Sequence, residues 1–358
     1  MRIAVLGVGL IGGSIGLAAR ARLDAEVAGF DPDRGLIDRA LELGAIDAVH
    51  DSVAEAVSGA EIAFCAAPVT ALPGLAAEAL DALPQDAAVT NVGSVKRDVI
   101  GALGGDSRFI GGHPLAGAET SGVDNARADL FEGARWYLTP TPRTGGLLYD
   151  RVQRAVAEMG ARPQAIEAET HDRLMATISH LPHVVANVLV NQAATALSEE
   201  AEHLPEVGPS FRDATRVAGA NPAIWGDIFA GNREAVASEI DAVIARLSEA
   251  SELLRSGDRA AVTKWHEQAG SRRRDLIEAE IAGGPLHELR VRVPNRPGIV
   301  AEVALALGRA GVNIEDMALY PAADMTSGAI SLYIAGDDEA ARAEELIRDL
   351  GHDVARAE

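Results

Sequence analysis

Short apolar runs alternate with alanine-rich helical patterns over the first 165 residues of the chain. The runs are continuous rather than alternating, which is typical of strands that are buried on both faces of a parallel sheet. We predict strands at residues 3–6, 27–30, 62–66, 87–92, 109–110, 136–138 and 163–166. Strands separated by helical patterns form βαβ units, so residues 1–165 are predicted to be an α/β domain with a doubly wound, mostly parallel sheet.

A helical pattern replaces the strand pattern in residues 166–282, where apolar positions recur with the spacing of an amphipathic helix. Helices are predicted at residues 168–200, 210–218, 222–230, 233–254 and 258–282. An all-helical domain should therefore follow the α/β domain. It ends at residues 283–285, a Gly-Gly-Pro sequence typical of a linker.

Residues 286–358 return to a mixed pattern of strands and helices. The pattern predicts a strand at 288–293, a helix at 298–308, strands at 313–320 and 330–335, a helix at 339–349 and a strand at 353–355. The order βαββαβ is that of the ferredoxin-like fold. Three domains are therefore predicted, with boundaries at 1–165, 166–282 and 286–358.

The charge of the chain limits its partners. Among 358 residues, 53 acidic and 32 basic side chains give a net charge of −21 at pH 7. A surface this acidic repels phosphate backbones and anionic lipids, which argues against nucleic-acid and membrane-surface binding. The single cysteine, Cys65, excludes an intramolecular disulfide. The first apolar run is too short for a signal peptide and no stretch approaches 18 uncharged apolar residues, so we expect a soluble, cytoplasmic protein.

A glycine-rich motif directly follows the first predicted strand and opens a helix. In the motif Gly7–Gly12, the first glycine permits a tight turn, the second lets the backbone approach a pyrophosphate, and the third allows close packing of helix and strand. Asp31 ends the second strand, where a carboxylate accepts hydrogen bonds from ribose hydroxyls and repels a 2′-phosphate. Arg34 could offset that repulsion, but we predict NAD rather than NADP as the cofactor. The predicted cofactor-binding residues are Gly7, Gly9, Leu10, Ile11, Gly12 and Asp31.

Polar side chains follow two consecutive strands of the predicted sheet. Ser94 and Lys96 come after the strand at 87–92, and His113 follows the strand at 109–110. Open α/β sheets bind ligands at the carboxyl ends of their strands. A hydroxyl and an imidazole are therefore predicted to face the nicotinamide together.

Histidines and arginines gather in the helical domain. His180 and His183 are three residues apart on one helix face, with Pro182 between them. A metal site is not predicted, because no third ligand is evident nearby in the sequence. Arg212 and Arg216 are four residues apart, and in so acidic a chain this pair is a candidate site for an anionic carboxylate. Structural histidines and a solvated arginine pair are the alternatives.

These residues together resemble the prephenate dehydrogenase family, whose members act in tyrosine biosynthesis and also use arogenate. The resemblance spans residues 1–282 and rests on five further motifs in the same order. They are Gly-Ser-x-Lys at 93–96, His-Pro-x-x-Gly at 113–117 with Glu119 and Ser121-Gly122, Ser-His-Leu-Pro-His at 179–183, Arg-Asp-x-x-Arg at 212–216 and Asn-Pro-x-x-Trp at 221–225. The resemblance implies a Rossmann domain, a helical dimerisation domain and a homodimer.

The resemblance also implies roles for individual residues. His113 is expected to be the catalytic hydrogen-bond acceptor for the ring hydroxyl of the substrate, and Ser94 to orient it. Arg216 is expected to bind the ring carboxylate. The remaining substrate-binding residues that it implies are His183 and Ser179 for the side chain, Glu119 and Asp213 in an ionic network near Arg216, and Trp225, which resembles a residue that reaches the neighbouring subunit's site.

The C-terminal segment, residues 286–358, resembles an ACT regulatory domain. Asn295 precedes its first helix and Asn313 its second strand. In relatives that bind amino acids, these two positions help to hold an effector. The resemblance therefore implies an aromatic amino-acid effector, with tyrosine the natural candidate, whereas a purely structural ACT domain is the alternative.

The reaction that the resemblance implies is NAD-dependent oxidative decarboxylation of prephenate. Arogenate dehydrogenation is one alternative. A β-hydroxyacid dehydrogenase or imine reductase is another, although such enzymes carry a catalytic lysine on the linking helix and residues 169–198 contain none. A non-catalytic sensor of NAD or amino acids is the third.

Overall fold

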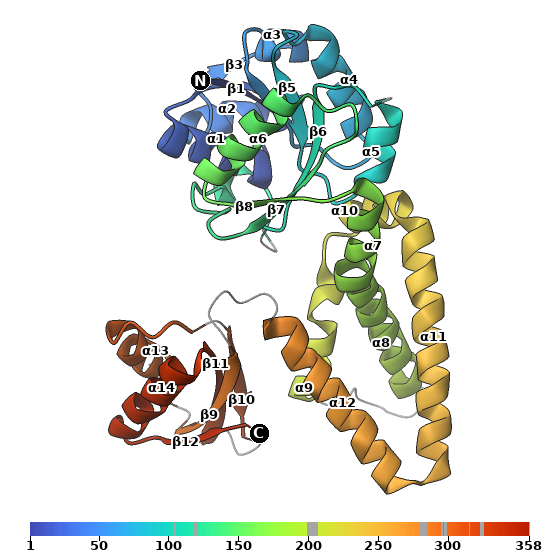
Figure 1. Cartoon of the computed structure of the whole chain (residues 1–358), viewed down its shortest axis with the longest axis vertical. Coiled ribbons are helices and arrows are strands. Elements are labelled where there is room, and N and C mark those ends of the chain that lie inside the picture. Colours follow the sequence, from blue (N-terminus) through green and yellow to red (C-terminus); the bar gives the residue numbers. More distant parts are fainter. Residues whose placement is uncertain are drawn as a thin grey trace. The chain divides into compact units, whose positions relative to one another are not determined.

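The computed structural model describes residues 1–103, 105–117, 120–198, 207–278, 285–294, 296, 299–314, 316–322 and 326–357. The chain divides into two compact units, Met1–Ala245 and Arg246–Glu358 (Figure 1). The first unit holds the α/β domain and the beginning of the helical region. The second holds the end of the helical region and the C-terminal antiparallel sheet.

An eight-stranded sheet forms the centre of the first unit, in the order β3-β2-β1-β4-β5-β6-β7-β8. Pairing is parallel except between β6 and β7, which confirms the doubly wound, mostly parallel α/β fold. The strands are β1 (Arg2–Leu6), β2 (Glu26–Phe30), β3 (Ala48–Val49), β4 (Ile62–Cys65), β5 (Ala88–Asn91), β6 (Phe109–Pro114), β7 (Arg135–Thr139) and β8 (Arg162–Ala165).

Two strands of this sheet differ from the prediction by more than one residue at an end. The edge strand β3 has two residues, which is too short for an apolar pattern to reveal. Strand β6 continues past its predicted end at Ile110 to Pro114, because Gly111 and Gly112 pair with β7. His113 therefore lies on a strand, opposite Tyr137.

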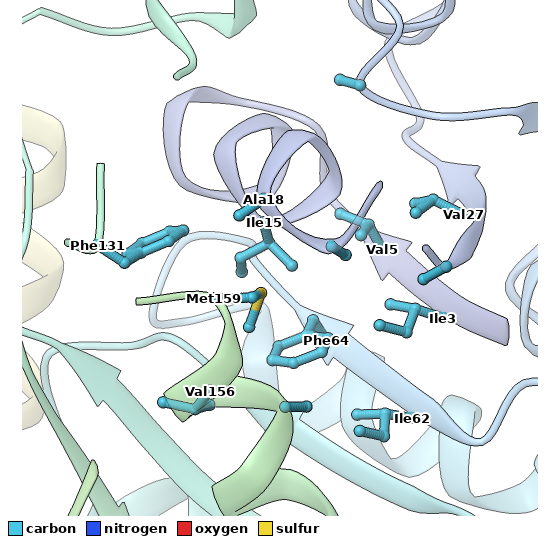
Figure 2. Close-up of a cluster of buried hydrophobic side chains, with 14 of the residues drawn as sticks. Ile3, Val5, Ile15, Ala18, Val27, Ile62, Phe64, Phe131, Val156 and Met159 are labelled. Atoms are coloured by element: carbon cyan, nitrogen blue, oxygen red, sulfur yellow. The ribbon is translucent and has the colours of Figure 1, made fainter. Parts of the chain in front are cut away.

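Helices cover both faces of this sheet, and apolar side chains fill the space beneath them. One cluster lies between the sheet and helices that include α1 and α6, with Ile15, Phe64 and Met159 at its centre (Figure 2). A second cluster fills the opposite face beneath α3, α4 and α5. The helices are α1 (Leu10–Leu23), α2 (Arg34–Glu42), α3 (Val53–Val57), α4 (Leu72–Ala82), α5 (Arg97–Ala102), the 3₁₀ turn η1 (Val123–Asn125) and α6 (Gly146–Glu158).

The helical region begins with a continuous helix that changes its winding near Pro182. Proline has no N–H for the α-helical bond to the carbonyl of Ile178, and a π-helical turn, η2, lies directly before it. The elements are α7 (Ala168–Met175), η2 (Ala176–His180), α8 (Leu181–Ser198), α9 (Pro209–Thr215), the 3₁₀ turn η3 (Arg216–Gly219), α10 (Pro222–Gly231) and α11 (Arg233–Ser256). The stretch Ala168–Leu197 is long and apolar enough, by length and composition alone, to cross a membrane.

The second unit contains α12 (Arg259–Glu278) and an antiparallel sheet in the order β10-β11-β9-β12. Apolar side chains from β9, β11 and both helices α13 and α14 form one core, which confirms the predicted βαββαβ module. Its elements are β9 (Leu286–Pro294), α13 (Ile299–Arg309), β10 (Asp316–Pro321), β11 (Ser327–Ala335), α14 (Asp337–Asp349) and β12 (Asp353–Arg356). Asn313 lies between α13 and β10, whereas Asn295 is outside the described residues.

Candidate active site

The glycine motif forms a turn between β1 and α1 in which Gly7 and Gly12 leave no room for a side chain. Gly7 has a φ of +97°, and a Cβ atom there would lie 2.4 Å from the carbonyl oxygen of Ala66. A Cβ atom at Gly12 would lie 1.8 Å from the carbonyl oxygen of Gly7, whereas one at Gly9 would meet open space. Gly9 therefore lies where a ligand can approach the backbone at the start of α1, as a dinucleotide pyrophosphate requires.

Asp31 lies beside this turn. Its Oδ2 accepts a hydrogen bond from the Val8 N–H at 2.9 Å, and its Oδ1 accepts one from the Asp33 N–H at 2.9 Å. Together with Gly7 and Gly9 it lines a mainly apolar cavity of about 420 Å³, which suits an adenosine moiety. Leu10 and Ile11 lie in the first turn of α1 and pack against the core.

Arg34, which could have accommodated a 2′-phosphate, has two carboxylate partners. Its Nε lies 3.2 Å from Asp38 Oδ1, and its Nη1 lies 2.8 Å from Asp51 Oδ1. These contacts offset its charge beside Asp31, so the cavity fits the free ribose hydroxyls of NAD better than a phosphate.

His113 and Ser94 line one cavity of about 470 Å³ at the carboxyl ends of β5 and β6. The helical region contributes Ser179, His180 and Trp225 to the lining of this cavity. The predicted convergence of hydroxyl and imidazole at one sheet edge is therefore present in the geometry. A ligand in this cavity would contact residues of the α/β domain and of the helical region together.

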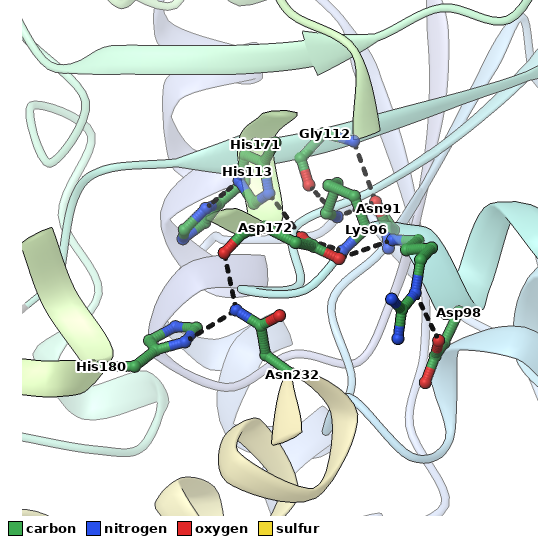
Figure 3. Close-up of polar contacts among 10 residues, drawn as sticks. Asn91, Lys96, Asp98, Gly112, His113, His171, Asp172, His180 and Asn232 are labelled. Carbon is green, nitrogen blue, oxygen red and sulfur yellow. Dashed lines mark hydrogen bonds and ion pairs between the residues drawn. The ribbon is translucent and has the colours of Figure 1, made fainter. Parts of the chain in front are cut away.

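The imidazole of His113 has a partner that the sequence analysis missed. Its Nδ1 lies 2.9 Å from Nε2 of His171, and Nδ1 of His171 lies 2.8 Å from Oδ1 of Asp172 (Figure 3). Burial lowers the pKa of His113 well below its ordinary value, and the neighbouring titratable groups of His171 and Lys96 lower it further. Burial also lowers the pKa of His171, against the opposing effect of Asp172. His113 is therefore a neutral imidazole at pH 7.

Lys96 connects the ends of β5 and β6. Its Nζ donates hydrogen bonds to Oδ1 of Asn91 at 2.7 Å and to the carbonyl oxygen of Gly112 at 2.6 Å. Asn91 Oδ1 also accepts the Gly112 N–H at 2.9 Å. The lysine side chain is fully buried, and this burial lowers its pKa to about 7. The loop that carries Ser94 is thus held against the residue before His113.

Asp172 joins the helical region to this edge of the sheet. Its carboxylate accepts the backbone N–H groups of Lys96 at 2.8 Å and of Arg97 at 2.9 Å, at the start of α5. Asn232 donates to the Asp172 carbonyl at 2.7 Å and contacts His180 Nδ1 at 3.1 Å. His180 is buried, which lowers its pKa to about 4. His180 is therefore a neutral structural contact of the network.

A second cavity, of about 680 Å³, is lined by Arg216, His183 and Trp225. The rings of His183 and Trp225 are stacked, with centroids 3.4 Å apart at 24°. Nδ1 of His183 donates to the carbonyl oxygen of Ser179 at 3.0 Å, and burial together with the charge of Arg216 lowers the pKa of His183. Trp225 lines both cavities of its own chain, so the two cavities adjoin at its indole.

The other predicted substrate residues are placed less closely. Asp213 is exposed on α9, and Glu119 lies outside the described residues. Arg212 directs its guanidinium to the Val207 carbonyl oxygen at 2.8 Å, so only Arg216 of the basic pair lines the larger cavity. Among the residues that the structure describes, no group of three or more His, Cys, Asp or Glu side chains could hold a metal ion.

A Rossmann-type sheet with a glycine-lined cavity, next to an imidazole at the strand ends, defines a nicotinamide-dependent dehydrogenase. Family models match in the same order: prephenate dehydrogenase nucleotide-binding domain at residues 15–165, prephenate dehydrogenase dimerization domain at 167–268 and ACT domain at 287–352. The first two models overlap the predicted α/β and helical domains.

Curated relatives and solved structures agree with these models. The prephenate dehydrogenase of Bacillus subtilis is 31% identical over 96% of this chain and 95% of its own length. The cyclohexadienyl dehydrogenase of Zymomonas mobilis is 34% identical over 72% of this chain and 89% of its own. The Aquifex aeolicus prephenate dehydrogenase, crystallised with hydroxyphenyl propionate and NAD+, is 32% identical and matches 76% of this chain and 97% of its own with a TM-score of 0.70.

The chain therefore belongs to the prephenate dehydrogenase family. It is an NAD-dependent oxidoreductase with a Rossmann domain, a helical dimerisation region and a C-terminal ACT domain, as the sequence motifs implied. The signals that the motif analysis overlooked are His171 and Asp172, which are adjacent in sequence at the start of the linking helix.

Proposed function

We propose that the chain catalyses the oxidative decarboxylation of prephenate to 4-hydroxyphenylpyruvate, with NAD as the hydride acceptor. The observation that carries the proposal is the placement of neutral His113 in a cavity that adjoins the Arg216 cavity at Trp225. Prephenate has a ring hydroxyl at one end and two carboxylates at the other. It therefore needs one proton acceptor and at least one cation in neighbouring pockets.

NAD held by the Gly7–Gly12 turn and Asp31 would supply a hydride acceptor for ring carbon 4 of the substrate. His113 accepts the proton of the ring hydroxyl, for which a neutral imidazole is required, and its low pKa keeps it neutral at pH 7. Ser94, in the same cavity, orients the hydroxyl and the imidazole. Loss of CO2 makes the ring aromatic, so the chain has to position and neutralise the substrate rather than activate it strongly.

The substrate is proposed to lie between the two cavities, with its ring carboxylate on the planar guanidinium of Arg216. His183 and Ser179 recognise the pyruvyl side chain. This assignment is supported by the hydrogen bond between His183 and the Ser179 backbone, which fixes the orientation of the imidazole. Trp225 closes the site by stacking on His183. Glu119 and Asp213 are proposed to contribute charge near Arg216.

Arogenate is the second candidate substrate, because it differs from prephenate only in the side chain that His183 and Ser179 would contact. The Synechocystis arogenate dehydrogenase is 26% identical and matches 76% of this chain and 99% of its own with a TM-score of 0.67. A hydroxyacid or imine reductase is disfavoured because residues 169–198 contain no lysine. A non-catalytic sensor would not need the buried arrangement around His113.

Substrate and cofactor choice can be measured in one assay. We expect the purified chain to form NADH from prephenate with NAD, and the rate with NADP to be much lower because Asp31 repels the 2′-phosphate. Replacement of Asp31 by Ala should lower the ratio of kcat/KM with NAD to kcat/KM with NADP. The variant loses both the acceptor for the ribose hydroxyls and the charge that repels a 2′-phosphate. Arogenate in place of prephenate identifies the second candidate. An enzyme that prefers NADP, or one inactive with both substrates, would contradict the proposal.

We also propose that the chain acts as a homodimer in the cytoplasm and that its domains are residues 1–165, 166–282 and 286–358. The family models at 15–165, 167–268 and 287–352 support these boundaries.

Exposed apolar side chains on α8 and α11 support the homodimer, because a second copy of the chain would bury them. They are Val188, Leu189, Val190, Ile244, Leu247 and Leu254. Helix α7 carries the buried polar residues His171 and Asp172, which argues against lipid contact along Ala168–Leu197.

The ACT domain is proposed to bind an aromatic amino acid, with Asn295 and Asn313 among its contacts. If it is the sensor, a chain ending at residue 285 should keep its activity and lose inhibition by tyrosine. The Aquifex aeolicus enzyme supports such a truncation, because it matches 76% of this chain over 97% of its own length. Steady-state inhibition with tyrosine and phenylalanine, on both chains, measures the effect. Full sensitivity of the truncated chain would instead indicate competition at Arg216 or His183.

A further inference from the structure

We propose that His171 and Asp172 form, with His113, a hydrogen-bonded chain that fixes the proton on Nδ1 of His113 and takes up positive charge when His113 accepts the substrate proton. This inference rests on the proposed function, since it requires His113 to be the proton acceptor. His171 and Asp172 act through His113 and are positioning residues. They lie 58 and 59 positions further along the sequence, on α7.

The direction of the hydrogen bonds follows from the partners of Asp172. Its Oδ1 and Oδ2 accept the backbone N–H groups of Lys96 and Arg97 at 2.8 and 2.9 Å, which fits an ionised carboxylate without a proton to donate. Nδ1 of His171, 2.8 Å from Oδ1, must therefore be the donor of that contact. In neutral His171 the proton is then on Nδ1, so its Nε2 has a free lone pair.

That lone pair determines the tautomer of His113. Nε2 of His171 lies 2.9 Å from Nδ1 of His113, and a hydrogen bond between them requires the proton on Nδ1 of His113. Nε2 of His113 is then left as the acceptor, and His113 lines the proposed catalytic cavity. The tautomer that proton abstraction needs is therefore the one that the chain of contacts selects.

The same contacts let the positive charge move away from the reacting atoms. When the substrate hydroxyl proton binds Nε2 of His113, the proton on Nδ1 of His113 can pass to Nε2 of His171. His171 then carries a proton on each nitrogen, and its charge faces the Asp172 carboxylate. No proton is gained or lost by the network beyond the one that leaves the substrate.

Because the site is buried, the Asp172 carboxylate is the main group that can stabilise a positive charge on His171. The side chain of His171 is inaccessible to solvent and that of Asp172 is 6% exposed, so water contributes little to stabilising an imidazolium there. The other titratable groups that face the pair are Lys96 from the β5–α5 loop, His180 from η2 and Tyr137 from β7. Lys96 disfavours added positive charge at His171, whereas the carboxylate of Asp172, at hydrogen-bond distance, favours it.

Replacement of His171 by two different amides separates its role as hydrogen-bond acceptor for His113 from its role in taking up positive charge. Asn at 171 can still donate to Asp172 but is too short to accept from His113, whereas Gln can present an oxygen near the former Nε2 position. We expect kcat to fall by about 10²-fold or more in His171→Asn, and by less in His171→Gln, which restores the acceptor without taking up the charge. KM values for prephenate and NAD should stay within about threefold in both variants, because His171 is not among the residues that line the proposed substrate and cofactor cavities.

Tyr137→Phe is the matched control, because it keeps the aromatic ring against His171 and changes no member of the chain. Its kcat should equal that of the unmodified protein. Equal losses in kcat for all three variants, or KM values that rise as kcat falls, would reduce His171 to a packing role. A His171→Asn variant with nearly full kcat would overturn the proposal.

Nitrogen-15 NMR of histidine-labelled full-length protein tests the tautomer without substrate. The His113 resonances, assigned by their loss in His113→Asn, should show the proton on Nδ1 at pH 7.5 and lose that preference in His171→Asn. A proton on Nε2 of His113 in the unmodified protein would overturn the inference even if prephenate is oxidised. Failure of the unmodified protein to oxidise prephenate or arogenate would contradict the proposed function, whatever the tautomer.

Discussion

Replacement of His113 by Asn should lower kcat for prephenate oxidation by about 10²–10⁴-fold, the usual contribution of a positioned acid–base group. The shorter amide keeps a donor on the side of His171, which lies 2.9 Å from the present Nδ1, and removes the Nε2 acceptor. The residue is buried, so water cannot easily replace the imidazole as proton acceptor. Steady-state NADH formation measures the loss.

NAD binding is the control for this variant. His113 lies at the end of β6. The cavity assigned to adenosine is lined by Gly7 and Gly9, which follow β1, and by Asp31, which follows β2. The dissociation constant for NAD, measured by fluorescence quenching, should therefore stay close to that of the unmodified protein. A variant with kcat within tenfold of normal would remove His113 from the catalytic role.

Replacement of Arg216 by Ala should raise KM for prephenate at least tenfold. A charge-assisted hydrogen bond to a carboxylate contributes roughly 1.5–3 kcal/mol, and about 1.4 kcal/mol corresponds to a factor of ten. Arg216 lines the cavity of about 680 Å³ together with His183, whose pKa is lowered by burial and, to a smaller extent, by the positive charge of Arg216. The KM for NAD should change much less, since Arg216 does not line the cavity that contains Gly7, Gly9 and Asp31.

Arg212→Ala is the matched control for this prediction. Arg212 is one helical turn earlier and directs its guanidinium to the Val207 carbonyl oxygen, so its loss removes the same charge without removing a cavity residue. Its KM for prephenate should remain near that of the unmodified protein. An unchanged KM in Arg216→Ala, or equal increases in both variants, would assign Arg216 to a structural or long-range electrostatic role.

The fold and the cofactor site are largely local properties of the sequence. Buried parallel strands appear as continuous apolar runs, and the turn at Gly7 needs a residue that tolerates a φ of +97°, so both can be recognised from neighbouring positions. Asp31 can be recognised in the same way, because it directly follows the second strand of the βαβ unit that contains the glycine motif. The βαββαβ order of the C-terminal domain likewise follows from short-range periodicity alone.

Strand ends and helix winding were harder to predict. The predicted strand ends at Ile110, but pairing of Gly111 and Gly112 with Thr139 and Leu138 on β7 extends β6 to Pro114. The pattern predicts one helix over residues 168–200, which contains Pro182, and the structure has a π-helical turn over Ala176–His180 within it. In both cases a neighbouring segment or an alternative hydrogen-bond pattern decides the outcome, and local preference does not specify it.

The sequence by itself determined the order of the domains, the glycine turn, the acid of the cofactor site and the candidate groups His113 and Arg216. Only the tertiary structure joined His113 to His171 and Asp172, and placed Lys96 between Asn91 and the Gly112 carbonyl. The contact of Asp172 with the Lys96 backbone spans 76 residues, and no local periodicity encodes such a pair. Burial by two packed domains then lowers the pKa values of the histidines, because removal of water disfavours their charged forms.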